Sequence, residues 1–125
     1  MTIKGLGTDI VEIERVEAQF QRLGQRFADR ILTANERGEL AASKAPARLL
    51  AKRFAVKEAV GKALGTGIGR GVSFQHIELG HNDDGAPKLH LSGGALARMQ
   101  ALGATDAHIS LADERRYAVA TVVLS

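Results

Sequence analysis

The sequence contains no cysteine, no tryptophan and only two prolines, and aromatic residues make up 4% of its 125 positions. The lack of cysteine excludes disulfides, catalysis by a thiolate and a metal held by sulfur. With so few aromatic residues the core must consist mainly of Ala, Leu, Val and Ile, which leaves room for stabilisation by oligomerisation. No uncharged apolar run is long enough to span a membrane, and the first residues lack the apolar stretch of a signal peptide. We therefore expect a cytoplasmic protein that does not bind membranes.

The remaining composition is that of a folded globular chain. Hydrophobic residues make up 45% of the sequence and charged residues 25%, which are ordinary values for such proteins. A chain of this length supports one hydrophobic core, and it contains no linker, internal repeat or low-complexity stretch. We therefore expect a single domain covering residues 1–125.

Positive charge is concentrated in the first half of the chain. Residues 15–62 hold 11 Lys and Arg against 5 Asp and Glu, a net charge of +6 in a chain whose total is +3. Such a patch favours an acidic partner, which can be nucleic acid, an acidic protein or a phosphorylated ligand. Arg15, Arg22, Arg26 and Arg30 stand close together in it. Partner binding and simple solvation of helix faces are both consistent with this spacing.

The hydrophobic pattern and the turn residues predict an α+β fold. Thr33 and Glu36 form a capping box at the start of a helix, Pro46 fits the first turn of the next, and Gly65 ends it. The predicted strands are residues 3–8, 73–80, 87–91, 107–112 and 117–124, and the predicted helices are residues 9–23, 33–42, 46–64 and 92–102, with a short helical turn at 27–32. The expected order is β-ααα-ββ-α-ββ, an antiparallel sheet covered on one side by helices.

The stretch from Arg53 to Gly71 carries the strongest chemical signal. Glu58 and Lys62 are four residues apart on the predicted helix and project from the same side of it. Gly65 then opens a loop with little side-chain bulk and many available backbone N–H groups. A carboxylate that can hold a hard cation, beside cations that can hold phosphate, suggests a site for a metal-bridged phosphate ester. An exposed Glu58–Lys62 pair is the plainer alternative, and the loop fits neither the P-loop nor the Rossmann pattern.

Asp9 is the second candidate metal ligand. It stands where the first predicted strand meets the first predicted helix, and with Glu12 three residues later it makes an acceptable helix N-cap. On spacing alone, the cap is the better interpretation. Mg²⁺ usually takes one or two carboxylates, with waters and substrate phosphate completing its shell, so Asp9 and Glu58 could share one ion. The four histidines have no metal-ligand spacing.

Three segments together resemble the 4′-phosphopantetheinyl transferases of the holo-[acyl-carrier-protein] synthase type. They are residues 5–12 (GLGTDIVE), residues 53–68 (RFAVKEAVGKALGTGI), and the HIS and YAVA runs that begin at His108 and Tyr117. The resemblance covers essentially the whole chain. It implies Mg²⁺-dependent transfer of the 4′-phosphopantetheine arm from coenzyme A to a serine of apo acyl carrier protein, a step of fatty acid biosynthesis that releases adenosine 3′,5′-bisphosphate. It also implies a homotrimer with active sites at the subunit interfaces.

The resemblance further implies roles for individual residues. Asp9 and Glu58 match the metal ligands, and Glu58 and Lys62 are the expected catalytic residues, with Lys62 at the phosphates. The other positions that match are Arg53, Gly65, Thr66 and His108 in the coenzyme A pocket, and Arg15 and Arg22 on the surface that contacts the acidic carrier protein. The hairpin residues Asn82, Gly85, Pro87 and Lys88 match a turn near the nucleotide only weakly.

The nucleophile of this reaction belongs to the partner, so the chain needs no serine–base couple of its own. A general base must still accept the serine proton, and Glu58 and a metal-bound water are both candidates. One segment departs from the family pattern. Leu111, Ala112 and Asp113 stand where many members have Ser or Thr and His, so no hydroxyl or imidazole role is expected there.

A non-catalytic module whose basic helices bind an acidic protein or nucleic acid is the alternative function. It explains the arginines of residues 15–30 but gives Glu58 and the glycine loop no role. A nucleic-acid binder would lose affinity steeply with salt. The sequence has no aromatic residues interleaved with the basic ones to stack on bases, so we expect no nucleic-acid partner.

Overall fold

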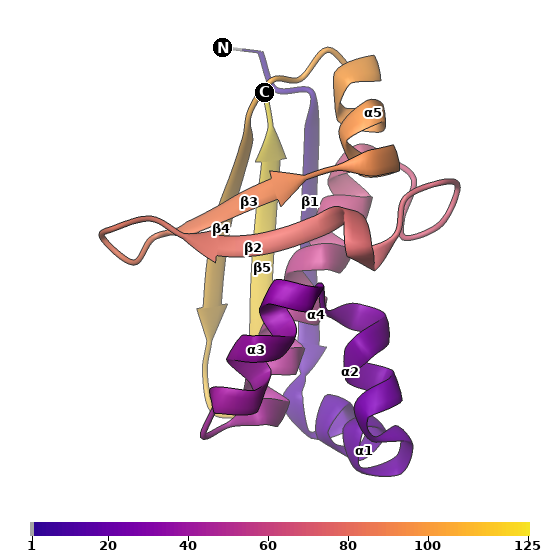
Figure 1. Ribbon diagram of the computed structural model, residues 1–125. Helices are drawn as coiled ribbons and strands as arrows, with labels where there is room; N and C mark the ends of the chain where they lie inside the picture. Colours follow the sequence, from indigo (N-terminus) through magenta and orange to yellow (C-terminus); the bar gives the residue numbers. More distant parts are fainter. Residues whose placement is uncertain (1) are drawn as a thin grey trace.

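Five strands form two antiparallel sheets in the computed structural model, which describes residues 2–125 (Figure 1). One sheet has the order β1-β5-β4, with β1 at Gly5–Glu12, β5 at Tyr117–Leu124 and β4 at Ala107–Asp113. The other is a ribbon of β2 (Ile77–His81) and β3 (Pro87–Leu91). The α+β class is therefore confirmed, although the one expected sheet is divided into two.

The helices gather around the long helix α4, which lies against β1 and β5 (Figure 1). Their bounds are α1 Ile13–Leu23, α2 Gln25–Ile31, α3 Ala34–Ala42, α4 Pro46–Leu64 and α5 Gly93–Ala101. The predicted bounds of α4 are confirmed, with Gly65 left-handed at φ 79° after its last residue. The predicted capping box of α3 is also present. Within residues 2–125, no helix is both long and apolar enough to cross a bilayer.

The hydrophobic core has two parts, and α4 contributes to both. One part joins Ala59 and Leu64 of α4 to Ile77 of β2 and Val122 of β5. The other lies under α1 and α2 and includes Leu50. Because α4 is buried on most of its circumference, its side chains reach the sheet, the ribbon and the N-terminal helices at once.

The boundary between β1 and α1 was predicted wrongly. The strand runs to Glu12 rather than to residue 8, because all of β1 pairs with β5, from Gly5 opposite Leu124 to Glu12 opposite Tyr117. Asp9 is a strand residue paired with Ala120, so its interpretation as a helix N-cap is also wrong.

Two further segments differ from the prediction. Residues 74–76 form a 3-10 turn (η1, Phe74–His76) before β2, because the Ser73 hydroxyl accepts the Gln75 N–H and the Ser73 N–H donates to the His76 ring. The short turn expected at residues 27–32 is the full helix α2, which adds one helix to the predicted order.

The sheet face turned away from α4 carries exposed apolar side chains. Leu6 and Ile10 of β1 are 65% and 64% exposed, and Val119 of β5 is 36% exposed. They alternate with residues that face α4, as side chains do along a strand. This open sheet face is consequently more apolar than an ordinary solvated strand face.

Candidate active site

Two glycines of β1 let the strand lie directly on the backbone of α4. A Cβ atom on Gly7 would come 2.1 Å from the carbonyl oxygen of Ala59, and one on Gly5 would come 2.2 Å from that of Ala63. Real Cβ atoms do not approach so closely, so any larger residue would push β1 away. This contact brings Asp9, two residues beyond Gly7, next to the side chains of α4.

Asp9 and Lys62 meet across this strand–helix contact. The Lys62 Nζ atom lies 2.9 Å from the Asp9 Oδ1 atom and 2.9 Å from the Thr8 carbonyl oxygen, to which it also donates. The Asp9 side chain is 16% exposed and that of Lys62 53%. The sequence spacing allowed an exposed ion pair between Lys62 and Glu58. In the structure Lys62 instead pairs with Asp9, on a strand that is distant in sequence.

Glu58 lies beside this pair, one helical turn before Lys62. Its carboxylate is half-buried and makes no ion pair with another described residue. Burial raises the pKa of the Glu58 carboxyl, the negative charge of Asp9 raises it further, and Lys62 partly opposes both. The folded chain thus holds two carboxylates close together with one lysine to balance them.

This donor set fits a hard divalent cation. Two carboxylates from different elements can supply oxygen ligands to Mg²⁺, which leaves the other positions for water and phosphate. Residues 2–125 contain no group of three or more His, Asp or Glu arranged to hold a metal by themselves. A cation here would therefore depend on Asp9 and Glu58, with water or oxygen atoms of a ligand completing its shell.

A cleft of about 680 Å³ extends from these carboxylates along α1 and α2. Asp9 and Glu58 stand among its lining residues, and Arg15, Arg22 and Arg30 give the wall a positive charge. The predicted carrier-binding residues Arg15 and Arg22 are thus brought to the same cleft as the carboxylates. The cleft combines a negatively charged pair, a basic wall and apolar side chains.

The apolar part of the cleft was not anticipated from the sequence. Phe27 of α2 and Phe54 of α4 line it, and both also pack against the core under α1 and α2. The sequence did contain a signal for this apolar part, because Phe54 precedes Glu58 by one helical turn and so lies on the same side of the helix. An aromatic residue in a helical pattern is nevertheless expected to lie in the core, as Phe54 partly does.

The glycine loop has fewer available N–H groups than expected. The N–H groups of Thr66 and Gly67 donate to the Gly61 carbonyl, and that of Gly65 donates to the Lys62 carbonyl. They close the C-terminal end of α4 as helix caps do. The start of the loop at Gly65 and Thr66 therefore lies one turn from Lys62, but its first amides are already bonded.

Two of the predicted coenzyme A residues lie away from Asp9 and Glu58. Arg53 is buried and faces α3, where its guanidinium contacts Glu36 and Glu39. His108 is exposed on β4, with its Nε2 atom 3.0 Å from the Ser125 hydroxyl. Its neighbours in β4 pack against the core, so His108 belongs to the open sheet face.

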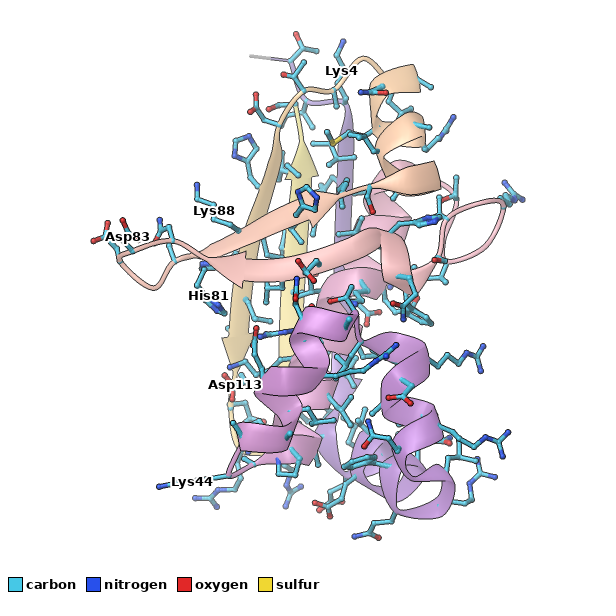
Figure 2. All side chains as sticks on the ribbon, viewed as in Figure 1. Lys4, Lys44, His81, Asp83, Lys88 and Asp113 are labelled. Atoms are coloured by element: carbon cyan, nitrogen blue, oxygen red, sulfur yellow. The ribbon has the colours of Figure 1, made fainter. Side chains whose placement is uncertain are left out.

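The segments of weaker resemblance are also peripheral within one chain. Lys88 and the turn residue Asp83 lie toward the projecting end of the β2–β3 ribbon (Figure 2). Asp113, at the end of β4, accepts from Arg48 of α4 at 2.8 Å and lies 3.6 Å from Lys52. Asp113 therefore ties the sheet to α4 and stands apart from the cleft.

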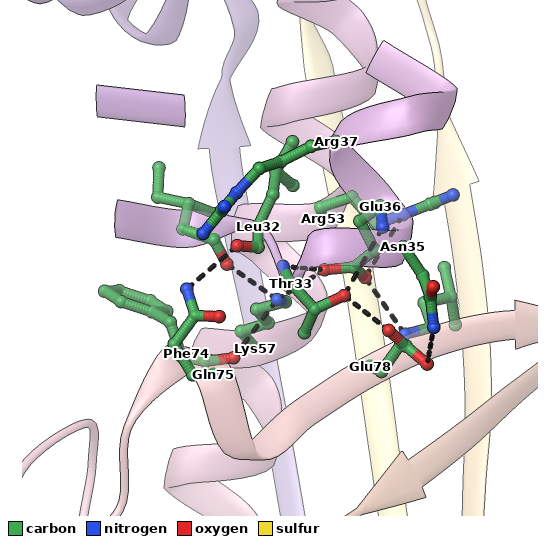
Figure 3. Close-up of polar contacts among 12 residues, drawn as sticks. Leu32, Thr33, Asn35, Glu36, Arg37, Arg53, Lys57, Phe74, Gln75 and Glu78 are labelled. Atoms are coloured by element: carbon green, nitrogen blue, oxygen red, sulfur yellow. Dashed lines mark hydrogen bonds and ion pairs between the residues drawn. The ribbon is translucent and has the colours of Figure 1, made fainter. Parts of the chain in front are cut away.

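A buried polar cluster beside the cleft was missed as well. Lys57 and Glu36 are fully buried and form an ion pair with 2.6 Å between Nζ and Oε1 (Figure 3). The signal was present in α4, where Lys57 falls midway between Leu50 and Leu64 in a seven-residue apolar spacing. A lysine at such a position must either interrupt the apolar face or be paired inside the protein.

Comparison with known proteins identifies the family. Residues 5–122 match the family described as the 4′-phosphopantetheinyl transferase superfamily. The chain belongs to this superfamily. A holo-[acyl-carrier-protein] synthase of Shewanella baltica is 61% identical over 124 residues, which cover 99% of this chain and 98% of that protein.

Solved structures agree with this assignment. The crystal structure of holo-[acyl-carrier-protein] synthase from Neisseria meningitidis is 40% identical, has a TM-score of 0.93, and matches over 99% of both chains. The Bacillus anthracis holo-(acyl-carrier-protein) synthase, solved in complex with CoA (3′,5′-ADP), is 39% identical with a TM-score of 0.82, over 99% of this chain and 97% of that one. The family predicted from the three sequence segments is confirmed.

Proposed function

We propose that the chain transfers the 4′-phosphopantetheine arm of coenzyme A to a serine of apo acyl carrier protein, in a Mg²⁺-dependent reaction that belongs to fatty acid biosynthesis. The observation that carries the proposal is the meeting of Asp9, Glu58 and Lys62 beside a cleft with a basic wall, which both carboxylates line. The names of its relatives and the coenzyme A bound by the Bacillus anthracis protein support the same substrates.

The proposed reaction is a phosphoryl-type transfer. The serine oxygen of the carrier protein attacks the phosphorus that bears the pantetheine arm, a new P–O bond forms, and the bond to the bridging oxygen breaks. The leaving group is adenosine 3′,5′-bisphosphate, which carries away the bridging oxygen and its electron pair. The enzyme's task is to align the two reactants and to neutralise the charge that develops on phosphate oxygens.

We assign the cation to Asp9 and Glu58. A bound Mg²⁺ would supply a positive charge that neutralises phosphate oxygens of the donor. Lys62, already within 2.9 Å of Asp9, is placed to contact the same phosphates as a compact charge. Glu58 is the carboxylate that Lys62 does not bind, so we propose it as the group that accepts the serine proton, directly or through a water.

The other predicted contacts remain part of the proposal. Gly65 and Thr66, one turn beyond Lys62, would lie along the donor, and Arg15 and Arg22 would face the acidic carrier protein from the wall of the cleft. A module that only bound an acidic protein would leave the Asp9–Glu58 pair without a role. We therefore favour the enzyme over the binding module, and we propose one transferase domain over residues 1–125.

We further propose a homotrimer in which neighbouring chains complete each site. His108 is exposed on the sheet face away from Asp9, so it reaches a donor molecule bound at the carboxylates only if subunits combine. The open sheet face with Leu6, Ile10 and Val119 offers an apolar surface for such an interface. Light scattering of the purified protein should give three times the chain mass, and a monomer mass would reject this part.

Mass spectrometry tests the activity directly. Incubation of the protein with coenzyme A, Mg²⁺ and apo carrier protein should add about 340 Da, the mass of one phosphopantetheine arm, to the carrier. Omitting coenzyme A or chelating the cation should prevent the gain. A folded sample that transfers no arm would reject the assignment.

The cytoplasmic location stays a prediction, which cell fractionation can check.

Variants of the two carboxylates test the ligand assignment. Asp9→Ala and Glu58→Ala should each lower the transfer rate by at least about 100-fold while the circular dichroism spectrum is unchanged. A matched control is Asp83→Ala, which removes a carboxylate from the exposed turn of the β2–β3 ribbon. Near-normal rates for either site variant across a Mg²⁺ titration would show that the ligands lie elsewhere.

A further inference from the structure

Lys57 occupies a fully buried node where four segments of the chain meet (Figure 3). Its Nζ atom donates to the Ile31 carbonyl at 2.6 Å, to Glu36 Oε1 at 2.6 Å and to the Phe74 carbonyl at 3.1 Å. An ammonium group has three donors, and all three are satisfied. The end of α2, the start of α3 and the turn before β2 are thereby bound to one point on α4.

Glu36 completes the node with both of its oxygens. Oε1 accepts the Thr33 N–H at 2.9 Å in addition to Lys57, and Oε2 accepts the Leu79 N–H of β2 at 3.0 Å. Arg53 lies one helical turn before Lys57, and its Nε atom is 3.5 Å from Glu36 Oε2. The carboxylate therefore binds Lys57 of α4 to the start of α3 and to β2, and the Arg53 guanidinium adds a weaker electrostatic attraction.

This node adjoins the proposed cation site along the same helix. Lys57 and Glu58 are consecutive, so their side chains leave α4 about 100° apart. Lys57 faces the node while Glu58 faces Asp9 of β1. A rotation of α4 about its axis that loosened the node would swing Glu58 relative to Asp9.

A buried ion pair is a costly way to stabilise a fold. The desolvation of two charges offsets most of their attraction, and a well-packed apolar pair of similar volume often stabilises as much or more. The charged pair instead fixes the orientation of the segments around it, because its hydrogen bonds are all satisfied in only one arrangement of those segments. We propose that Lys57 and Glu36 are positioning residues that fix the rotation of α4 and so hold Glu58 at the cation site.

The cation in this inference comes from the proposed function, on which the inference therefore rests. Measuring cation binding tests the positioning role separately from catalysis. The probe is Mn²⁺, followed by electron paramagnetic resonance on the purified full chain without substrates. Glu36→Gln keeps the volume but replaces one accepting oxygen by an NH₂ group, so the node cannot close. The dissociation constant of this variant for Mn²⁺ should rise about tenfold. This is the lower end of the effect seen when residues that orient metal ligands are removed. Lys57→Met should do the same.

Leu50→Ala is the matched control, because Leu50 is fully buried on α4 but lies outside the node and does not line the cleft. It should lower the denaturant midpoint as the node variants do and leave Mn²⁺ affinity within about twofold of the unmodified chain. In the transfer assay, the Mg²⁺ concentration for half-maximal rate should rise about tenfold for Glu36→Gln and stay unchanged for Leu50→Ala.

The outcomes separate the two proposals. Unchanged Mn²⁺ affinity in Glu36→Gln, or an equal loss in Leu50→Ala, would overturn the positioning role. If Lys57→Met does not fold, Glu36→Gln decides alone. An unmodified chain that binds Mn²⁺ but transfers no arm would refute the proposed function and leave the positioning role to the Mn²⁺ comparison. A chain that does neither would refute both.

Discussion

At the scale of single residues, the site is defined by an imbalance of charge. Asp9 is close enough to Glu58 to disfavour the ionised form of the Glu58 carboxyl, while Lys62 forms its ion pair with Asp9. The sequence indicated that Glu58 and Lys62 share a helix face. It could not indicate that Lys62 turns to Asp9, because that contact depends on how closely β1 approaches α4.

The raised pKa of Glu58 predicts a pH-dependent cost to stability. The folded chain holds the Glu58 proton more tightly than the unfolded chain, so stability falls as pH rises from about 4.3, the usual Glu pKa, through the raised value. Glu58→Gln should therefore unfold at a higher temperature than the unmodified chain at pH 8 without divalent cations. Because Glu58 is partly exposed, we expect a gain of no more than about 1 kcal/mol.

Thermal melts over a pH series can check this difference. The advantage of Glu58→Gln should disappear below about pH 4, where the unmodified carboxyl is protonated in both states. Added Mg²⁺ should stabilise the unmodified chain more than the variant. A variant that is less stable than the unmodified chain at pH 8 in chelator would contradict the charge imbalance.

At the scale of elements, the predictions were accurate where one residue type dictates the backbone. Thr33 with Glu36, and Pro46 with Gly65, fixed α3 and α4 because capping and helix termination depend on nearby residues alone. The end of β1 was wrong because pairing with β5 overrode the local preference of Asp9 for a helix start. Sequence spacing contains no information on a partner strand so far along the chain.

The contact between β1 and α4 predicts a strict requirement for glycine at position 7. In Gly7→Ala the new methyl group would meet the Ala59 carbonyl oxygen and the Ala63 nitrogen, at 2.1 and 2.6 Å, and neither backbone atom can move aside easily. We expect a loss of at least about 2 kcal/mol in the free energy of unfolding, measured by urea titration. Transfer activity should fall with it, since Asp9 would be displaced.

Gly80→Ala is the control for this substitution. Gly80 lies in β2, and a Cβ atom there would meet nothing within 4 Å. Its stability should stay within about 0.5 kcal/mol of the unmodified chain. If both alanine variants were equally stable, β1 and α4 would not touch as described.

The ion pairs of Asp113 predict a second pH effect, of opposite sign. The hydrogen bond from Arg48 lowers the pKa of Asp113, and Lys52 lowers it further. The carboxylate therefore stabilises the fold above about pH 3.9, its usual pKa, and this contribution is lost as pH falls through the lowered value. Asp113→Asn should cost about 0.5 kcal/mol at pH 7 and less at pH 2. Urea titrations at both pH values measure the difference.

At the scale of the whole molecule, the uneven charge distribution becomes a binding property. Arg15, Arg22 and Arg30 line one cleft, so a part of the positive excess of residues 15–62 stands on one surface. The composition predicted the excess, but only the packing of α1 and α2 against α4 determines which face carries it. The same packing separates Arg53 from the cleft, which the sequence could not indicate.

Charge reversal tests whether this surface receives the carrier protein. Arg15→Glu and Arg22→Glu should each raise the KM for carrier protein about tenfold at low salt, because an acidic partner would meet repulsion, and kcat should change little. Added salt should lower the rate of the unmodified chain and reduce the difference between the proteins. Lys88→Glu, on the β2–β3 ribbon, is a control of equal charge. An unchanged KM in both arginine variants would show that the carrier protein binds to another surface.

The pairing of β1 with β5 also affects how the chain is made. The ribosome completes residues 5–12 early, but their partner strand is synthesised only after β4. Until then the strand that carries Asp9 has no partner strand, and contacts between such distant segments form slowly. The strand pairing that holds Asp9 in the folded chain therefore cannot form until residues 117–124 have been synthesised.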